Sequence, residues 1–154
     1  MSATIAPESP LSDDMRQMIR ELNAVLLELS PPEACYHMTP EEMAGPETTV
    51  FAARIGGEMA ACGALHRHGE GIGEVKRMYT RPAFQGQGLG SAILNRIVSL
   101  AQEESLSCLV LETGDKHPAA WRIYENAGFS RCGPVLDYPD SPYSIFYQRP
   151  VNAA

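Results

Sequence analysis

The sequence lacks the features that would place the protein in a membrane or on nucleic acid. No apolar run approaches the roughly 18 to 20 residues of a membrane-spanning helix, and the first residues lack the basic and then apolar pattern of a signal peptide. Basic residues are scarce, since 12 Lys and Arg stand against 19 Asp and Glu, which gives a net charge of −7. Nucleic acid would need a basic face, so we expect a soluble, cytoplasmic protein without a nucleic-acid or membrane partner.

Cysteines are few, and their spacing suits no metal. The chain has Cys35, Cys62, Cys108 and Cys132, which form no C-x-x-C pair and match no zinc template. Cys62 and Cys108 lie in apolar runs, where a thiol behaves as a small hydrophobic group. We therefore expect reduced, structural cysteines and no metal site.

The chain is long enough for one folded domain with a substantial core. It has 154 residues, 44% of them hydrophobic, and it shows no internal repeat and no interdomain linker. We therefore predict a single domain over residues 1–154.

Hydrophobic periodicity in the N-terminal part predicts a helix after a short strand at Ile5. Ser9 or Ser12 can cap this helix, and the prolines after Ser30 end it. Its apolar face would belong to the core or to the wall of a substrate cleft, with core the simpler interpretation. The residues of this face are Leu11, Met15, Met18, Leu22, Val25 and Leu29. A short second helix can begin after Thr39.

The remaining chain alternates between strand-like and helical patterns. Strand-like runs at residues 48–55, 58–66 and 72–80, joined by glycine-containing turns, predict an antiparallel meander. Further elements are expected at residues 88–104 (helix), 108–111 (central strand), 118–127 (helix), and 129–135 and 144–149 (strands). The order β-α-(α)-βββ-α-β-α-ββ predicts one mixed α/β sheet flanked by helices.

A glycine-rich segment, Gln85-Gly86-Gln87-Gly88-Leu89-Gly90, stands between a predicted strand and a predicted helix. Glycine lets a ligand approach the backbone closely, and the first N–H groups of a helix are free to bind phosphate. The dinucleotide fingerprint would need glycine at Ser91, and the Gly-Lys-Ser/Thr of a Walker loop is absent. A tight turn whose glycines serve packing is the alternative interpretation.

The segment Gln85-x-x-Gly88-x-Gly90 matches the Q/R-x-x-G-x-G/A signature of the GNAT N-acetyltransferase superfamily, which this sequence resembles. The residues from Glu74 to Pro82 resemble the strand and turn before that signature. Ala120-x-x-Ile123-Tyr124-x-x-x-Gly128-Phe129 resembles the later helix that carries the catalytic tyrosine. The resemblance covers residues 48–149 and implies a mostly antiparallel sheet with splayed middle strands, and acetyl-CoA as co-substrate.

The resemblance also implies where acetyl-CoA binds. The amides of residues 86–90 would hold the pyrophosphate, and pantetheine would pair with the backbone of Met78 and Thr80 in a slot beside the strand at 108–112. Many relatives have Asn where this chain has His117, so the contact there departs from the family pattern. The expected acetyl-CoA-binding residues are Met78, Tyr79, Thr80, Gln85, Gly86, Gln87, Gly88, Leu89, Gly90 and His117.

Acetyl transfer from a thioester to an amine requires a neutral amine, a donor to the oxyanion and a proton for the departing thiolate. Tyr124 is the expected proton donor; the alternative is a core tyrosine that packs with Trp121 and Phe129. Glu74 and Glu112 stand at strand ends beside the slot and are the expected bases, and a solvated strand end is the alternative for each. His66 and His68 are further candidates for the base, and a backbone N–H near Met78 could serve the oxyanion.

Three basic residues, Lys76, Arg77 and Arg81, precede the glycine-rich segment. They could contact the phosphates of acetyl-CoA or a carboxylate on the substrate, or they could be exposed to solvent. Because a strand alternates its faces, Lys76 and Arg77 are expected on opposite sides.

Together these features predict an N-acetyltransferase that moves an acetyl group from acetyl-CoA to a primary amine of a small molecule, by direct attack in a ternary complex. A peptide or protein acetyltransferase and a non-catalytic acyl-CoA-binding sensor are the alternatives. The resemblance implies an acceptor pocket formed by variable loops and the first helices, which here include residues 31–46 and 138–143. The sequence specifies neither the acceptor nor the oligomeric state, and a homodimer is compatible with it.

Overall fold

The computed structural model describes residues 2–151, and the outermost residues of the expected domain, 1 and 152–154, lie outside them. The elements are β1 (Ala3–Pro7), α1 (Asp13–Leu29), η1 (Pro32–Ala34), α2 (Pro40–Met43), β2 (Thr48–Ile55), β3 (Glu58–Gly69), β4 (Ile72–Thr80), η2 (Pro82–Phe84), α3 (Leu89–Glu103), β5 (Cys108–Gly114), α4 (Pro118–Asn126), β6 (Ser130–Cys132) and β7 (Ser144–Pro150). Apart from the short 3-10 turns, this is the predicted order of elements.

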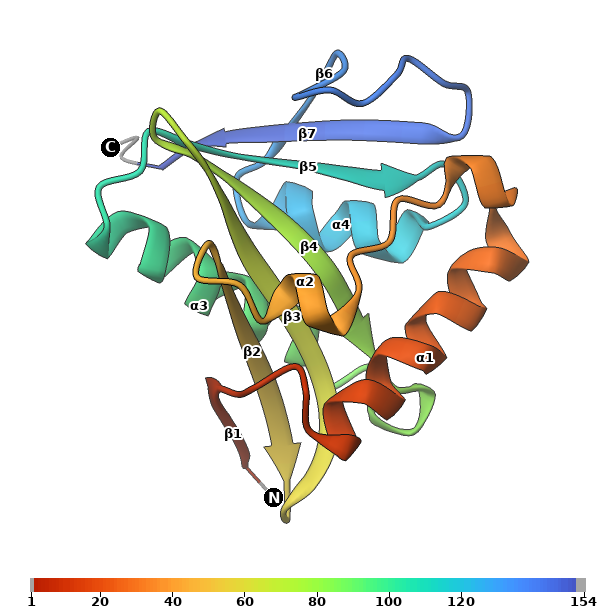
Figure 1. Ribbon diagram of the computed structural model, residues 1–154, viewed down its shortest axis with the longest axis vertical. Helices are drawn as coiled ribbons and strands as arrows, with labels where there is room; N and C mark the ends of the chain where they lie inside the picture. The colour runs from red at the N-terminus through yellow and green to blue at the C-terminus, as the bar shows by residue number, and fades with distance from the viewer. Residues whose placement is uncertain (1, 152–154) are drawn as a thin grey trace.

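One seven-stranded sheet connects the molecule, in the order β1-β2-β3-β4-β5-β7-β6 (Figure 1). All neighbouring strands are antiparallel except β4 and β5, which run parallel. That pair is hydrogen-bonded only from Ile72–Glu74 to Cys108–Val110, and beyond this point the strands diverge. The predicted mixed sheet with splayed middle strands is confirmed.

Helices cover both faces of the sheet. On one face, α3 and α4 bury Ile93, Ile97 and Tyr124 against Phe51 and Leu65 of the sheet. On the other face, α1 and α2 bury a methionine-rich cluster against β2 and β3. Figure 1 shows α1 and α2 in front of the strands and α3 behind them. The sheet is therefore buried on two sides, and the gap between β4 and β5 lies inside the layered structure.

Local sequence signals explain the helix ends. The Ser12 hydroxyl accepts a hydrogen bond from the Met15 N–H at 3.2 Å and caps α1, and the helix ends before Pro31. Thr39 and Glu42 form a capping box that starts α2. Both helices begin where the sequence predicts.

Three strand ends differ by more than one residue from the predicted ones, and one of them is that of β5, which continues to Gly114 instead of ending at residue 111. β6 covers three residues, Ser130–Cys132, instead of 129–135, because Gly133 and Pro134 follow and proline cannot donate to a ladder. β3 continues to Gly69, three residues past the predicted end. No helix within residues 2–151 combines the length and apolarity needed to cross a membrane.

Candidate active site

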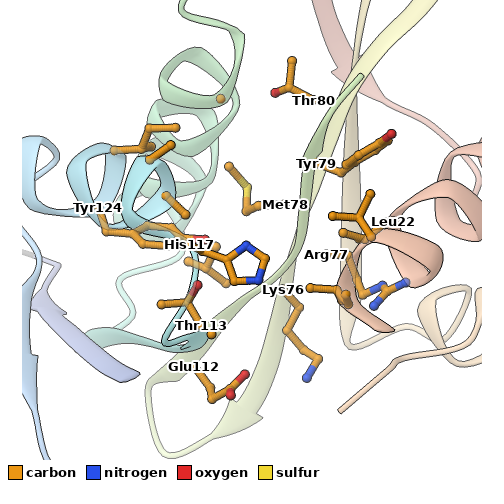
Figure 2. Close-up of a pocket in the computed structure, with 18 of the residues that line it drawn as sticks. Leu22, Lys76, Arg77, Met78, Tyr79, Thr80, Glu112, Thr113, His117 and Tyr124 are labelled. Atoms are coloured by element: carbon orange, nitrogen blue, oxygen red, sulfur yellow. The ribbon is translucent and has the colours of Figure 1, made fainter. Parts of the chain in front are cut away.

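A cavity of about 700 Å³ opens where β4 and β5 diverge (Figure 2). Residues 74–80 of β4 form one wall, and because they are consecutive, the cavity reaches both faces of the strand. Lys76 and Arg77 therefore both line it, although side chains alternate along a strand. The other walls come from α1, residues 34–36, the start of α3, the end of β5, α4 and Tyr138.

The start of α3 supplies free backbone donors to this cavity. Gly88 is the N-cap with φ of 78°, no side chain caps the helix, and its first turn holds no acidic residue. Gly86 has φ of 82°, and a Cβ on Gly86 or Gly88 would meet nothing within 4 Å. These two glycines are therefore required by backbone conformation and not by packing. A Cβ on Gly90, in contrast, would lie 3.0 Å from Cδ1 of Ile123, so Gly90 serves close helix packing.

The edge of β4 that faces β5 is unpaired beyond Glu74 in the described sheet. On its other edge β4 pairs with β3, but the register shifts between Cys62↔Tyr79 and Ala64↔Lys76. Arg77 and Met78 thus stand opposite a single residue of β3, Gly63, in a β-bulge. The open edge offers peptide N–H and C=O groups to an extended ligand.

Tyr124 lies at the edge of the cavity and is 6% exposed. Its ring packs edge-on against Phe129, with centroids 6.0 Å apart, and is tilted against Tyr147 at 5.9 Å. Trp121 instead stacks with Arg131 and donates to the carbonyl of Gly114. Burial above all, with the nearby Glu112 and Tyr147, raises the pKa of Tyr124, so its hydroxyl keeps its proton at neutral pH. Nothing within residues 2–151 hydrogen-bonds this hydroxyl.

Glu112 lines the cavity from β5. The Ser144 hydroxyl donates to its carboxylate at 2.7 Å. Burial raises the pKa of Glu112, and the hydrogen bond from Ser144 opposes this shift only in part. A carboxylate with a raised pKa accepts a proton more readily near neutral pH than an exposed glutamate does.

Glu74 is buried at 3% exposure, in contrast to the alternative of a solvated strand end. His68 Nε2 lies 2.7 Å from one carboxylate oxygen, and Lys76 Nζ lies 3.3 Å from the other. The hydroxyl of Tyr138 also donates to Glu74, and Lys76 donates to this hydroxyl at 2.8 Å. Glu74 is therefore engaged by three partners, whereas Glu112 has one. His66 bonds to Thr48 at 2.7 Å.

His117 lines the cavity, and its Nε2 is buried without a partner among the described residues. Its ring packs so closely on Gly114 that a Cβ there would lie 2.5 Å from Cδ2 of His117. Burial lowers the pKa of His117, which leaves a neutral imidazole at pH 7. Its unpaired nitrogen is a hydrogen-bonding group that a bound ligand can satisfy.

The cavity brings together most of the residues singled out in the sequence. The exceptions are Gln87, which is exposed, and the candidates His66, His68 and Arg81, none of which lines the cavity. The structure places the others on the wall: Glu74, Lys76, Arg77, Met78, Tyr79, Thr80, Gln85, Gly86, Gly88, Leu89, Gly90, Glu112, His117 and Tyr124. No group of three or more His, Cys, Asp or Glu side chains in the described chain is placed to hold a metal ion.

Other wall residues carried no motif in the sequence. Leu22, Val25 and Leu26 of α1 line the cavity, whereas Met15 and Met18 of the same helix are in the core. The apolar face of α1 is therefore core in its first half and cavity wall in its second half. Tyr36 and Tyr138 pack edge-on with centroids 5.0 Å apart and both line the cavity. They come from the two segments expected to form the acceptor pocket.

Comparison with known proteins identifies the family. The model of the Acetyltransferase (GNAT) family matches residues 15–129, which is most of the chain. The chain belongs to the GNAT acetyltransferase family. This acetyltransferase is therefore an acyltransferase of the EC 2.3.1 type, and enzymes of its family use acetyl-CoA.

Individual relatives agree with this assignment. The chain is 37% identical to an IAA acetyltransferase of Azospirillum brasilense over 97% of its own length and 99% of the relative. It is 35% identical to the uncharacterised N-acetyltransferase YsnE of Bacillus subtilis, with 87% and 93% covered. A structure assigned as an acyl-CoA N-acyltransferase from Klebsiella pneumoniae superposes with a TM-score of 0.82 and 29% identity, and 97% of each chain is covered.

Proposed function

We propose that this acetyltransferase moves the acetyl group of acetyl-CoA to the primary amine of a small molecule, by direct attack in a ternary complex. One observation carries the proposal: a single cavity contains the free amides of α3, the unpaired edge of β4, and the side chains of Glu112 and Tyr124. The same cavity thus contains hydrogen-bond donors for an anion, an open strand edge for an extended ligand and two groups that can transfer protons.

The residues present fit acetyl-CoA. The uncapped N-terminus of α3, with Gly86 and Gly88 in left-handed conformation, suits a pyrophosphate. The open edge of β4 at Met78 and Thr80 suits the amides of pantetheine, and the unpaired Nε2 of His117 adds a further polar contact. When bound, acetyl-CoA supplies an activated acetyl group as its thioester.

Glu112 and Tyr124 carry out the proton transfers of the reaction. Glu112 takes a proton from the acceptor amine as the new N–C bond forms and the C–S bond breaks, a role that its raised pKa supports. Tyr124 holds its proton until the thiolate departs and then donates it. Backbone N–H groups of the β4 bulge near Met78 are the donors proposed for the oxyanion.

The walls of the cavity support a small acceptor. The cavity has walls beyond the glycine turn and β4, and these come from α1, residues 34–36 and Tyr138. These walls can enclose an acceptor. The similarity to an IAA acetyltransferase, 99% of which is covered, also favours a small acceptor. A peptide acceptor would need these walls to admit an extended chain.

A turnover assay with acetyl-CoA tests the proposal and separates it from both alternatives. We expect thiol release that depends on a small amine and matches the amount of N-acetylated product found by mass spectrometry. Acetylation confined to lysine or N-terminal peptides would contradict the proposal in favour of a protein acceptor. Binding of acetyl-CoA without turnover on any amine or peptide would instead indicate a sensor.

A further inference from the structure

Arg77 is a buried cation without an anionic partner in the described part of the chain. It is 7% exposed and lines the cavity. One Nη donates to Oδ1 of Asn23 in α1, whereas its Nε is buried with no partner among residues 2–151. A buried, unpaired charge is costly, so such groups are normally paired.

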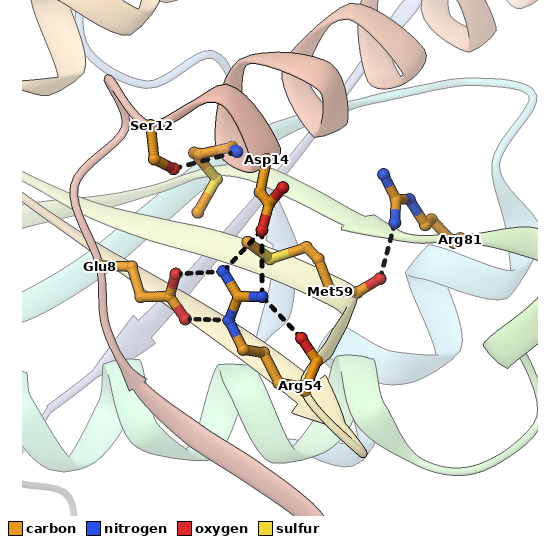
Figure 3. Close-up of polar contacts among 8 residues, drawn as sticks. Glu8, Ser12, Asp14, Arg54, Met59 and Arg81 are labelled. Atoms are coloured by element: carbon orange, nitrogen blue, oxygen red, sulfur yellow. Dashed lines mark hydrogen bonds and ion pairs between the residues drawn. The ribbon is translucent and has the colours of Figure 1, made fainter.

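Several half-buried arginines of the chain pair with carboxylates, whereas half-buried Arg149 donates to backbone carbonyls. Arg54 binds both carboxylate oxygens of Glu8, at 2.8 and 2.9 Å (Figure 3). Arg67 binds Glu104 in the same bidentate way, and Arg81 binds Glu21. Arg77 is the more deeply buried side chain, yet no ion pair involves it in the described chain.

The groups around Arg77 do not neutralise its charge. The thiol of Cys62 donates to the Arg77 carbonyl, and burial raises the pKa of this thiol to about 12, so it carries no charge at pH 7. Burial first, and then the charges of Arg77 and Lys76, lower the pKa of His37, which is also neutral. Lys76 has its own counter-charge in Glu74. Arg77 itself stays protonated, since a guanidinium does not lose its proton in proteins.

The backbone at Arg77 has a strained conformation, which fixes the direction of its side chain. Its φ is 58°, in the left-handed region that non-glycine residues rarely adopt. The bulge turns Arg77 toward α1, while Met78 points to the opposite side of β4, as Figure 2 shows. Unusual backbone conformations of this kind cluster at ligand sites.

Arg77 lies across β4 from side chains that are proposed to act on acetyl-CoA. Figure 2 shows Arg77 and Leu22 on the α1 side of β4, whereas Tyr124 and His117 lie on the other side. The wall beside Arg77 is apolar, since it contains Leu22, Val25 and Leu26. A carboxylate that reached Arg77 would meet a planar donor group in a site of low polarity, where the pairing is strong.

We propose that Arg77 binds a carboxylate of the acceptor, so that the substrate of this enzyme is an amine that also carries a carboxylate, as amino acids do. The unpaired Nε and an Nη would donate to the two carboxylate oxygens. The apolar face of α1 would contact the rest of the molecule, and Glu112 would meet its amine. This inference rests on the proposed acetyl transfer and specifies the acceptor.

Matched amines test the inference. One set is phenylalanine, phenylalaninamide and 2-phenylethylamine, and an aliphatic set is leucine, leucinamide and isopentylamine. We expect kcat/KM to be at least about tenfold higher for the acid than for the amide or the plain amine, because a charged hydrogen bond is lost in the latter two. The amide has the more acidic ammonium group, so amine ionisation works against this preference.

The Arg77→Gln variant should remove the preference for the acid, mainly through KM, and Arg77→Lys should keep part of it. Arg81→Gln is the matched control, because Arg81 is already paired with Glu21 and does not line the cavity; the acid-to-amide ratio should not change. Thermal melting and acetyl-CoA titration establish that each variant is folded. Equal turnover of acid and amide by the parent enzyme, or an undiminished preference in Arg77→Gln, would overturn the inference.

A binding measurement separates this inference from the proposed function. Calorimetry of phenylalanine and phenylalaninamide with the CoA-loaded protein needs no turnover. Binding of the acid that exceeds that of the amide and depends on Arg77 supports the carboxylate site, even if no amine of either set is acetylated and acetyl transfer itself fails. Equal binding, or none, overturns the site while leaving turnover of other amines intact.

Discussion

Gly63 of β3 lies directly against Met78 of β4 across the bulge: a Cβ on Gly63 would be 2.4 Å from Met78 Sδ and 2.7 Å from Ile93 Cγ2. A methyl group at position 63 must therefore displace one of these side chains. We expect Gly63→Ala to lower the free energy of unfolding by about 1–3 kcal/mol, the usual effect of overpacking. Urea denaturation measures this change.

Gly133→Ala is the control for that substitution. A Cβ on Gly133 would meet nothing within 4 Å, and this glycine is not in the left-handed region. Its replacement should leave the free energy of unfolding unchanged or raise it by about 0.4–1 kcal/mol, because alanine reduces the conformational entropy of the unfolded chain. Equal effects of the two substitutions would show that the bulge does not depend on the missing side chain.

Tyr124→Phe isolates the proposed proton donor. The hydroxyl lacks a hydrogen-bond partner within residues 2–151, so its removal should leave the melting temperature and acetyl-CoA binding nearly unchanged. Turnover should fall about 10²-fold or more, the usual contribution of general acid catalysis. Tyr143→Phe is the matched control and should keep full activity, because this side chain is 40% exposed and, unlike Tyr138 of the same segment, does not line the cavity. Full turnover in Tyr124→Phe would remove the acid role.

Glu112→Gln should lower activity and raise stability at neutral pH. The pKa of Glu112 is raised in the folded protein, so the folded state holds this proton more tightly than the unfolded state does. The carboxylate therefore costs stability once the pH exceeds the pKa of the unfolded chain. The gain in the variant should disappear as the pH falls below about 4.3, the ordinary pKa of glutamate.

The same variant should change the pH profile of catalysis. In the parent enzyme kcat/KM should rise with pH as Glu112 loses its proton, with a midpoint above the ordinary range for glutamate. In Glu112→Gln this limb should vanish, and the rate should drop by about 10²-fold or more. An unchanged profile would assign the base to another group.

Gly90→Val should crowd the part of the cavity wall where α3 meets Ile123 of α4 and Thr80 of β4. The Cβ would already lie 3.0 Å from Ile123 Cδ1 and 3.8 Å from Thr80 Oγ1, and valine adds two methyl groups beyond it. We expect a higher KM for acetyl-CoA with a smaller change in the KM for the amine. An increase confined to the amine would place the coenzyme elsewhere.

Much of the fold followed from local patterns. The stripe from Leu11 to Leu29, with Ser9 or Ser12 as cap, predicted the first helix, and Thr39 predicted the start of the second. Glycine turns separated the meander strands because few other residues adopt positive φ. β6 was predicted too long, although Gly133 and Pro134 limit its pairing with β7 locally.

The site was predicted less evenly. The glycine turn is a short-range motif, whereas Tyr124 was singled out by the resemblance to the family. That Glu74 is enclosed by His68, Lys76 and Tyr138 depends on side chains up to 64 residues apart in the chain, which no spacing reveals. The state of Arg77 likewise depends on a bulge and on Asn23 of a distant helix.

Calorimetric titration of acetyl-CoA into the unmodified protein tests the central claim most directly, because every proposed step requires the coenzyme in the slot between β4 and β5. The account predicts saturable binding of one molecule per chain well below millimolar concentration, weakened in Gly90→Val and retained in Tyr124→Phe. Absence of binding at millimolar acetyl-CoA, or equal binding by Gly90→Val, would contradict it.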